Sequence, residues 1–305
     1  MTNYTEDRVA AVIVTRNRLA MLEECVGALT KQTRPVDEII IVDNDSTDGT
    51  RAWLAERPSL RVLHQANLGG AGGFHIGIRT AVERGHDWVW CMDDDGYPAA
   101  DCLVQLLSLE RDDLWLRGPL VLARDDPSRL AFLLRPPGCD TIGTAGQAAG
   151  AAQNGLLWDV ACPFNGVLIH RQIVRLVGLP IAGMFLWGDE NEYCLRAKGA
   201  GFKMATVSTA RFYHPFDRMV EHHFKLFGRE RCIVYVDEPL RDYLAIRNRA
   251  YILRHYNTVG SAIRHIGLYA MFYGKTRGLR GLFWAIRAGW AGLCGDWRGH
   301  QRFLH

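Results

Sequence analysis

Blocks of apolar residues alternate with polar segments through the first hundred residues of the chain. Val9–Thr15 is a run of β-branched and small apolar residues and predicts a buried strand. Leu19–Lys31 follows with apolar residues at helical spacing and predicts a helix. Five later segments continue this order, namely the strands Glu38–Val42, Leu60–His64 and Trp88–Met92 and the helices Thr50–Glu56 and Phe74–Arg84. Strands that alternate with helices predict a parallel sheet covered by helices on both faces.

The pattern is less regular beyond residue 115. Gly118–Ala123 is a short apolar run, and the Gly/Ala-rich stretch Gly138–Gly155 predicts a mobile loop. Cys162–His170 predicts a strand. Arg171–Val177 and Asn191–Lys198 predict short helices, each followed by glycine. This half of the chain adds elements to the fold without the clear repeat of the first half.

Polar clusters follow the strands of the first half. They are Thr15–Asn17, Asp43–Asp48, Asn67–Gly73 and Asp93–Asp95. In an open parallel sheet, ligands bind beyond the carboxyl ends of the strands. We therefore expect the four clusters to meet at one edge and to form one site.

Three consecutive carboxylates, Asp93, Asp94 and Asp95, follow a buried strand. They repel one another, and a divalent cation is a natural means of neutralising them. Ligands that are oxygen atoms favour Mg²⁺ or Mn²⁺, which commonly share their coordination with substrate phosphates. The alternative is a solvated acidic turn with Asp95 and Gly96 as turn residues.

Two glycine motifs resemble nucleotide-binding loops only in part. In Gly70–Gly73, the position of the third glycine of a dinucleotide fingerprint is taken by His75, and this excludes a dehydrogenase. Gly274-Lys275-Thr276 has Tyr269 where a phosphate-binding loop requires glycine. The first loop either lets the backbone approach a ligand or serves as a flexible helix entry.

Two further positions carry candidate chemistry. Asp189 and Glu190 open a predicted helix, where acidic residues are common caps, but a carboxylate fixed there can also act as a general base. His214 precedes a proline and is either structural or a metal ligand.

Composition and charge divide the chain unevenly. Its 305 residues are 48% hydrophobic and 23% charged, as in ordinary globular proteins of one large domain or two. Residues 241–305 hold 11 basic and 2 acidic residues, which leaves 25 basic and 31 acidic residues before them. A mildly acidic body is thus followed by a strongly basic tail.

Cysteines and apolar runs bear on the cellular location. The eight cysteines are scattered singly and predict reduced core thiols in a cytosolic protein. Residues 1–8 do not look like a secretory signal, and no apolar run approaches the ~18 residues of a membrane span.

The tail combines its 11 basic residues with 11 aromatic ones. Basic and aromatic residues at helical spacing, as in Gly278–Trp290, predict a helix in a membrane interface. Nucleic-acid binding and a helical pair between subunits are the alternatives, and the second leaves an oligomer open. We favour the membrane surface and expect no nucleic-acid partner.

Four segments in this order resemble family 2 glycosyltransferases with the GT-A fold: Val12–Asn17, Val42–Thr50, Asp93–Asp95 and Gly188–Tyr193. A narrower set is similar to the bacterial galactofuranosyltransferases that initiate galactan chains on a lipid-linked acceptor. It comprises Asn67–Phe74, Asp87–Trp90, Asp126–Phe132, Phe164–Gly166 and Arg247–Arg249. The resemblance implies an α/β GT-A domain over residues 1–240, with a donor half to about 115 and an acceptor half from 116, and a basic helical extension over 241–305.

The resemblance also implies roles for single residues. Donor binding falls to Thr15, Arg16, Asn17, Asp43, Asn67, Gly70, Asp93 and Asp94, with Asp43 bonded to the uracil or ribose. Asp95, Asp93 and His214 would hold the metal, and Asn165 and Trp187 would bind the acceptor. Glu190 would be the catalytic base, with Asp189 beside it as the alternative.

The implied enzyme takes part in cell-wall polysaccharide synthesis. It would transfer galactofuranose from UDP-galactofuranose to a lipid-linked or cell-surface glycan, with inversion and with Mn²⁺ or Mg²⁺. It would act in the cytoplasm, at the inner face of the plasma membrane. The alternatives are a rhamnosyltransferase that uses dTDP-rhamnose and a protein of this fold that binds a membrane or polyanion without catalysis.

Overall fold

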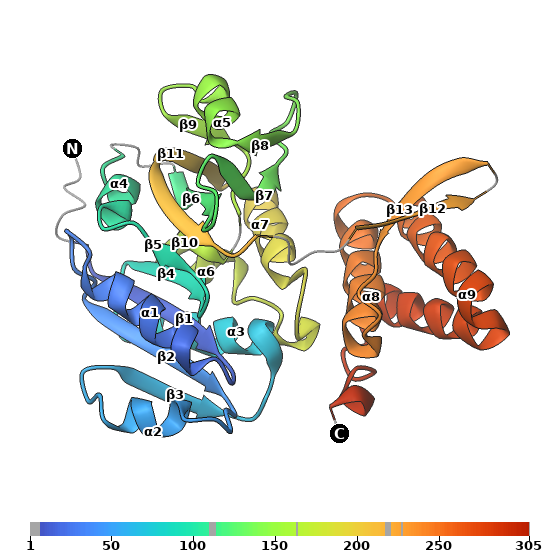
Figure 1. The fold of residues 1–305 in the computed structure, drawn as a ribbon, viewed down its shortest axis with the longest axis horizontal. Coiled ribbons are helices and arrows are strands. Elements are labelled where there is room, and N and C mark those ends of the chain that lie inside the picture. Colours follow the sequence, from blue (N-terminus) through green and yellow to red (C-terminus); the bar gives the residue numbers. More distant parts are fainter. Residues whose placement is uncertain (1–6, 110–113, 163, 217–220, 227, 305) are drawn as a thin grey trace. The chain divides into compact units, whose positions relative to one another are not determined.

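The computed structural model of the chain describes residues 7–109, 114–162, 164–216, 221–226 and 228–304 (Figure 1). It divides into two compact units. The N-terminal unit comprises Met1–Pro180 and Tyr193–Phe216, and the C-terminal unit comprises Ile181–Glu192 and Asp217–His305. The C-terminal unit thus includes a short internal segment, and its main part begins before residue 240.

A parallel sheet forms the first part of the N-terminal unit. Its strands are β1 (Val9–Thr15), β2 (Glu38–Asn44), β3 (Arg61–Gln65) and β4 (Trp88–Asp93), in the order β3-β2-β1-β4. The intervening helices are α1 (Leu19–Thr30), α2 (Thr50–Ala55) and α3 (Gly69–Glu83). The predicted parallel arrangement is confirmed, with element ends within two residues of prediction except at the start of α3.

Side chains of β1 alternate between two cores, as a strand buried on both faces requires. Val9, Ala11 and Ile13 pack in one cluster with residues of α1. Ala10, Val12 and Val14 pack in the other with residues of α3. Glycines allow the close approach of α3, because a Cβ at Gly73 or Gly77 would overlap Val14 or Val12 of β1. The helix was predicted to begin at Phe74; this was wrong, because the glycines belong to its packed face.

Further strands widen this sheet on the side of β4. They are β5 (Tyr97–Pro98), β6 (Leu114–Ala123), β7 (Arg129–Leu134), β8 (Ile142–Thr144), β9 (Leu156–Trp158), β10 (Asn165–His170) and β11 (Lys203–His214). β10 runs antiparallel to β4 and β6, and β11 runs parallel to β6. The helices of this part are α4 (Cys102–Leu107), α5 (Ala145–Ala151) and α6 (Arg171–Val177), while α7 (Asp189–Gly199) crosses the boundary between the units.

The stretch Gly138–Gly155 differs from its prediction. Instead of a mobile loop, it contains β8 and α5. A capping box begins α5: Thr144 Oγ1 accepts a bond from Gln147 N at 3.2 Å, and Gln147 Oε1 accepts one from Thr144 N at 3.1 Å. This local signal, and the burial of Ala148, outweigh the loop-like Gly/Ala composition.

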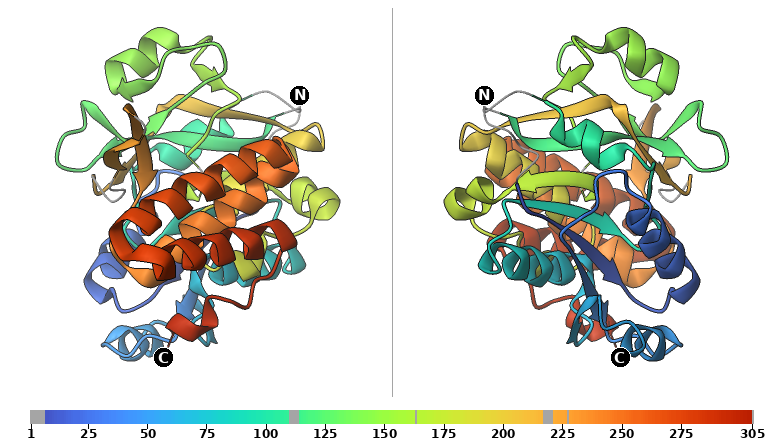
Figure 2. Two further views of the ribbon diagram at one scale, coloured as in Figure 1. Left: turned by 90° about the vertical axis from the view of Figure 1, so that its right-hand side faces the viewer. Right: turned by 90° about the vertical axis from the view of Figure 1, so that its left-hand side faces the viewer.

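The C-terminal unit contains the hairpin β12 (Glu221–Leu226) and β13 (Arg229–Val234), α8 (Pro239–Tyr256) and α9 (Val259–Cys294), with 3₁₀ turns at Ala182–Met184 and Gln301–Phe303 (Figure 2). Gly278 breaks α9 into two halves with φ 65° and ψ −159°. The halves meet where Gly289 packs on Ile266, and the second half touches α8 where Gly292 meets the carbonyl of Arg247. Aromatic residues, among them Tyr243, Tyr269 and Tyr273, fill the core.

The structure also bears on the predictions for the cysteines and for membrane spans. Cys25, Cys91, Cys102, Cys162 and Cys194 are buried, as expected of core thiols, whereas Cys139, Cys232 and Cys294 are exposed. Among the described residues, no helix combines the length and the apolar character needed to cross a bilayer.

Candidate active site

The carboxyl ends of the parallel strands meet at one edge of the sheet, as predicted. Thr15 lies opposite Asp43, and Val14 lies opposite Asp93. Hydrogen bonds then join the loops that follow these strands. Asn44 Nδ2, for example, donates to the carbonyl oxygen of Gly69 at 2.9 Å. Polar clusters from four places in the sequence are therefore linked by hydrogen bonds at one edge of the sheet in the N-terminal unit.

The acidic triplet lies in a turn that is closed by a bond from Gly96 N to Asp93 O at 3.1 Å. Asp94 and Asp95 are buried, and Asp93 is half-buried. Arg18 Nη1 lies 3.1 Å from Asp94 Oδ1 and 3.1 Å from Asp95 Oδ2. Thr15 Oγ1 donates to Asp94 Oδ2 at 2.8 Å. The triplet is therefore a structured acidic cluster, not a solvated turn.

Burial and the ion pair act in opposite directions on the pKa values of this cluster. Burial raises the pKa of Asp94, and the charge of Arg18 and the bond from Thr15 offset this only in part. Burial alone would lower the pKa of Arg18, but Asp94 and Asp95 outweigh it and raise that pKa. Sequence reasoning did not name Arg18; Arg16, which it named as a donor-binding residue, is exposed, and that role stays a prediction. The sequence pattern that could have indicated Arg18 is a basic residue in the loop between β1 and α1, beside the predicted acidic site.

His214, at the end of β11, approaches the triplet from another part of the sheet. Its Nε2 lies 3.2 Å from Asp95 Oδ1, and its Nδ1 lies 2.7 Å from the carbonyl oxygen of Pro215. A ring nitrogen so close to a carbonyl carries the proton, which leaves Nε2 as the atom that can bind a metal. The ring also packs on Phe132, with centroids 4.8 Å apart.

These residues fit a cation that is completed by substrate. Within the described parts of the chain, no three His, Cys, Asp or Glu side chains gather as a closed metal site. Asp95 and His214 do form a buried carboxylate and imidazole pair. Mg²⁺ and Mn²⁺ sites that use one or two protein ligands take their remaining oxygens from phosphates and water.

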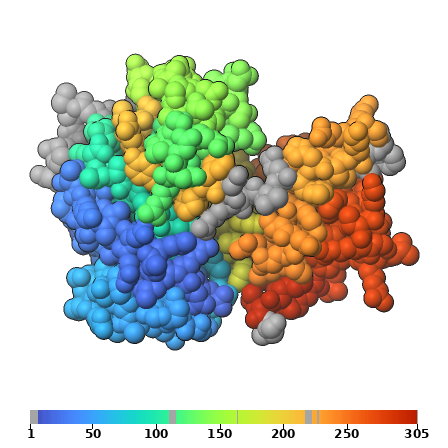
Figure 3. Space-filling view, viewed as in Figure 1, coloured from blue at the N-terminus to red at the C-terminus, as the bar shows by residue number. Residues whose placement is uncertain are grey.

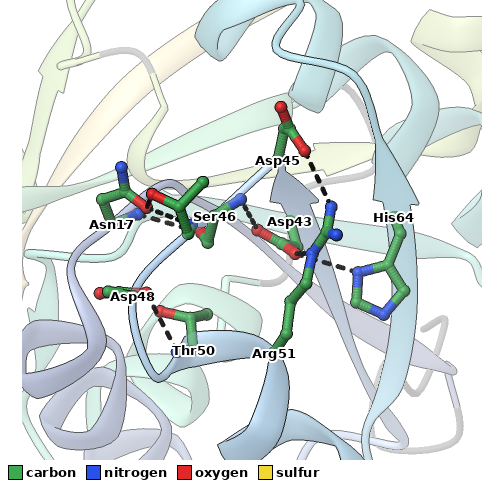
Figure 4. Close-up of polar contacts among 9 residues, drawn as sticks. Asn17, Asp43, Asp45, Ser46, Asp48, Thr50, Arg51 and His64 are labelled. Atoms are coloured by element: carbon green, nitrogen blue, oxygen red, sulfur yellow. Dashed lines mark hydrogen bonds and ion pairs between the residues drawn. The ribbon is translucent and has the colours of Figure 1, made fainter.

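A second cluster surrounds Asp43 at the end of β2 (Figure 4). Asp43 Oδ1 accepts a bond from Ser46 N at 2.9 Å, and Oδ2 lies 3.1 Å from Arg51 Nε and 3.0 Å from His64 Nδ1. Burial would raise the pKa of Asp43, but the bonds from Ser46, His64 and Arg51 outweigh it and lower that pKa. Arg51 and His64, which sequence reasoning missed, are exposed by about half. Their side chains are the exposed polar groups of this cluster.

The other predicted donor residues tie the loops together. Asn17, which has φ 54°, accepts a bond from Thr47 N at its Oδ1 at 2.6 Å, and its own N–H donates to Ser46 Oγ at 3.0 Å. Asn67 Oδ1 accepts a bond from Gly69 N at 3.1 Å, at the start of α3. Gly70 follows in the first turn of that helix.

The predicted base lies in the C-terminal unit, at the start of α7. Asp189 is buried, and Glu190 is half-buried and accepts a bond from Gly188 N at its Oε2 at 2.9 Å. Trp187 is half-buried, with the Arg241 guanidinium 5.8 Å from its ring. Asn165 lies in the N-terminal unit opposite Met92 of β4, one residue before the triplet. The meeting of residues 93–95 with 189–190, and the roles of Asn165 and Trp187 in acceptor binding, stay predictions.

Comparison with known proteins identifies the family. The profile of Glycosyl transferase family 2 matches residues 10–113. The chain is 35% identical over 251 residues to galactofuranosyltransferase GlfT1 of Mycolicibacterium smegmatis, which covers 80% of this chain and 82% of the relative. This chain belongs to family 2 of the glycosyltransferases. Within that family it is close to galactofuranosyltransferases.

Two more distant proteins complete the comparison. The dTDP-rhamnosyl transferase RfbF of Shigella flexneri is 23% identical over 81% of this chain and 80% of its own length. The structure of GalNAc-T7 with UDP, GalNAc and Mn²⁺ superposes with a TM-score of 0.61 at 15% identity, over 94% of this chain and 55% of that one. The fold is GT-A, as predicted.

Proposed function

We propose that this glycosyltransferase moves galactofuranose from UDP-galactofuranose to a hydroxyl of a lipid-linked or cell-surface glycan, with inversion and with Mn²⁺ or Mg²⁺. The observation that carries the choice of sugar is the 35% identity to a galactofuranosyltransferase over four fifths of the chain. The lower identity to a rhamnosyltransferase makes dTDP-rhamnose the second candidate. We place the enzyme at the cytoplasmic face of the plasma membrane.

Two residues of the N-terminal unit would hold the cation, with Asp93 as the third predicted ligand. Asp95 and His214 offer a carboxylate and an imidazole, and Arg18 fixes Asp95 from the opposite oxygen. A bound divalent ion supplies positive charge to the departing diphosphate. Arg51 and His64, held by Asp43, present N–H donors beside the expected nucleotide pocket. They are the groups through which Asp43 would act on the uridine.

Glu190 would supply the proton acceptor. The acceptor hydroxyl gives its proton to the carboxylate, and its oxygen forms a bond to the anomeric carbon. The bond from that carbon to the diphosphate oxygen breaks at the same time, and UDP leaves with the electron pair. One displacement from the opposite face inverts the anomeric centre. Asp189 remains the second candidate for the base.

A panel of donors tests the proposal. We expect acceptor-dependent release of UDP from UDP-galactofuranose in the presence of Mn²⁺ or Mg²⁺, and its loss with a chelator. UDP-galactopyranose and dTDP-rhamnose serve as comparison donors, with a lipid-linked disaccharide as acceptor. Faster transfer from dTDP-rhamnose would establish the rhamnosyltransferase instead. No transfer from any donor, together with retained binding to vesicles, would favour the protein without catalysis.

An exposed apolar stripe on α9 supports the membrane as a partner. Leu279, Phe283, Ile286 and Trp290 are 74%, 64%, 41% and 65% exposed, and their spacing places them on one face of the second half of α9. The C-terminal helices lie at the surface in Figure 3, coloured orange to red. α9 has five Lys and Arg residues and no Asp or Glu. Two such faces would repel each other, whereas anionic lipid attracts each basic residue by about 1 kcal/mol.

The double variant Phe283→Ser/Trp290→Ser is expected to bind anionic vesicles about tenfold or more weakly, since burying one large apolar side chain contributes about 1.5–3 kcal/mol. Flotation with phosphatidylglycerol vesicles measures this effect. Leu133→Ser/Leu176→Ser, which alters exposed apolar residues of the N-terminal unit, is the control. Unchanged flotation of the α9 variant would contradict the proposal. A change in its oligomeric state alone would assign the stripe to contact between copies.

A further inference from the structure

The segment before the predicted base has an unusual backbone. Phe185, Trp187 and Gly188 all have positive φ angles, of 68°, 63° and 98°. For Phe and Trp this region is sterically unfavourable, so the rest of the unit must hold them there. The 3₁₀ turn Ala182–Met184 lies directly before this segment, and α7 with Asp189 and Glu190 lies directly after it.

Two adjacent side chains of α8 hold this segment through its carbonyl groups. Asn248 Nδ2 lies 3.0 Å from Met184 O, 2.9 Å from Leu186 O and 2.6 Å from Trp187 O. Arg247 Nη2 lies 3.0 Å from Gly183 O and 2.8 Å from Met184 O. Both side chains are buried, and solvent therefore does not compete for these bonds.

Arg247 is itself fixed, although no carboxylate among the described residues forms an ion pair with it. Its Nε donates to Asn248 Oδ1 at 2.9 Å, and its Nη1 lies 3.0 Å from His300 Nδ1. Burial lowers the pKa of Arg247 to about 10, so the guanidinium keeps its charge at neutral pH. The carbonyl oxygens of residues 183 and 184 take the place of a counter-ion. These carbonyl groups thus stabilise the charge of Arg247, and Arg247 in turn holds the backbone of the segment in place.

One peptide unit connects Asn248 to the predicted base. The carbonyl of Trp187, held by Asn248 at 2.6 Å, shares a planar peptide with the N–H of Gly188. That N–H donates to Glu190 Oε2 at 2.9 Å. A fixed direction of the C=O fixes the direction of the N–H, because the peptide does not rotate internally. Asn248 therefore determines where one oxygen of Glu190 is held.

We infer that Asn248, supported by Arg247, is a positioning residue for catalysis. It orients the Trp187–Gly188 peptide, which holds Glu190 Oε2 and leaves Oε1 as the oxygen that receives the proton of the acceptor. This inference rests on the proposed function, in which Glu190 is the base. It assigns a role in the transfer to α8. From composition alone, the region that contains most of α8 was described only as a basic and aromatic tail.

The variant Asn248→Ala tests the inference in steady-state transfer from UDP-galactofuranose. We expect kcat to fall by about 10- to 100-fold, the range found on mutation of residues that orient metal-binding side chains through hydrogen bonds. KM for the donor is expected to stay within about threefold, because donor groups are untouched. Arg249→Ala, the exposed neighbour on α8, is the matched control and should retain wild-type kcat. Wild-type kcat in Asn248→Ala would overturn the inference.

A double-mutant cycle separates positioning from general damage to the fold. In a Glu190→Gln background, Asn248→Ala should lower single-turnover transfer by less than about twofold, since the group that it orients no longer accepts a proton. An equal loss in both backgrounds would overturn the inference. Should Asn248→Ala fail to fold, Asn248→Ser retains one donor and should give an intermediate kcat with the same dependence on Glu190. Wild-type turnover in Glu190→Gln would instead show that the proposed base is wrong, a result distinct from a failure of Asn248.

Discussion

The variant Asp95→Asn is expected to reduce metal-dependent transfer by about 100-fold or more. Asp95 is the buried carboxylate that faces both His214 and Arg18, and the change to an amide removes its charge without changing its size. Metal ions stabilise developing charge by several kcal/mol, and each 1.36 kcal/mol is about a factor of ten in rate. Release of UDP at a series of Mn²⁺ concentrations measures the loss, and the apparent affinity for Mn²⁺ should fall with it.

Asp140→Asn is the matched control for Asp95→Asn. Asp140 is exposed in the segment between β7 and β8, and its variant should keep wild-type activity and response to Mn²⁺. Asp95→Asn with a normal response to Mn²⁺ would remove Asp95 from the metal site.

Glu190→Gln should lower turnover by about 10²- to 10⁴-fold, the usual contribution of a general base. Glutamine keeps a side-chain oxygen that can accept the bond from Gly188 N but cannot take a proton from an alcohol. Donor affinity, measured by calorimetry with UDP, should change by less than about threefold. Asp189→Asn, made in parallel, should have the smaller effect on turnover.

Glu83→Gln provides the control for this variant, since Glu83 is exposed at the end of α3 in the N-terminal unit. The opposite ranking, with full activity in Glu190→Gln and none in Asp189→Asn, would make Asp189 the base. That result would also end the role inferred for Asn248.

Sequence patterns sufficed for the parallel half of the fold. Val9–Thr15 is a strand over the predicted range because a fully buried strand needs an unbroken apolar run, and the chain supplies one. α3 was predicted too short, since glycine has a low helix propensity in isolation. Its glycines are favoured here by packing on β1, a tertiary contact that local propensity does not contain.

The site was predictable to the level of its loops but not of its side-chain partners. Strand order alone brings Thr15, Asp43 and Asp93 to one edge. Whether Arg16 or Arg18 turns toward the triplet depends on the backbone of the loop after β1, where Asn17 has φ 54°. Likewise, Arg51 and His64 reach Asp43 from different elements, and one sequence gives no sign of this pairing.

Gly278 determines what the last helix can be. An unbroken helix of 36 residues would extend about 54 Å in one direction, and its two halves could not pack against each other. The torsion pair at Gly278 lies in a region that only glycine readily occupies. Any other amino acid at position 278 would favour a straight helix. Straightening would separate Gly289 from Ile266, and the apolar stripe would no longer lie beside the first half of α9. A single missing side chain thus sets which direction that stripe faces.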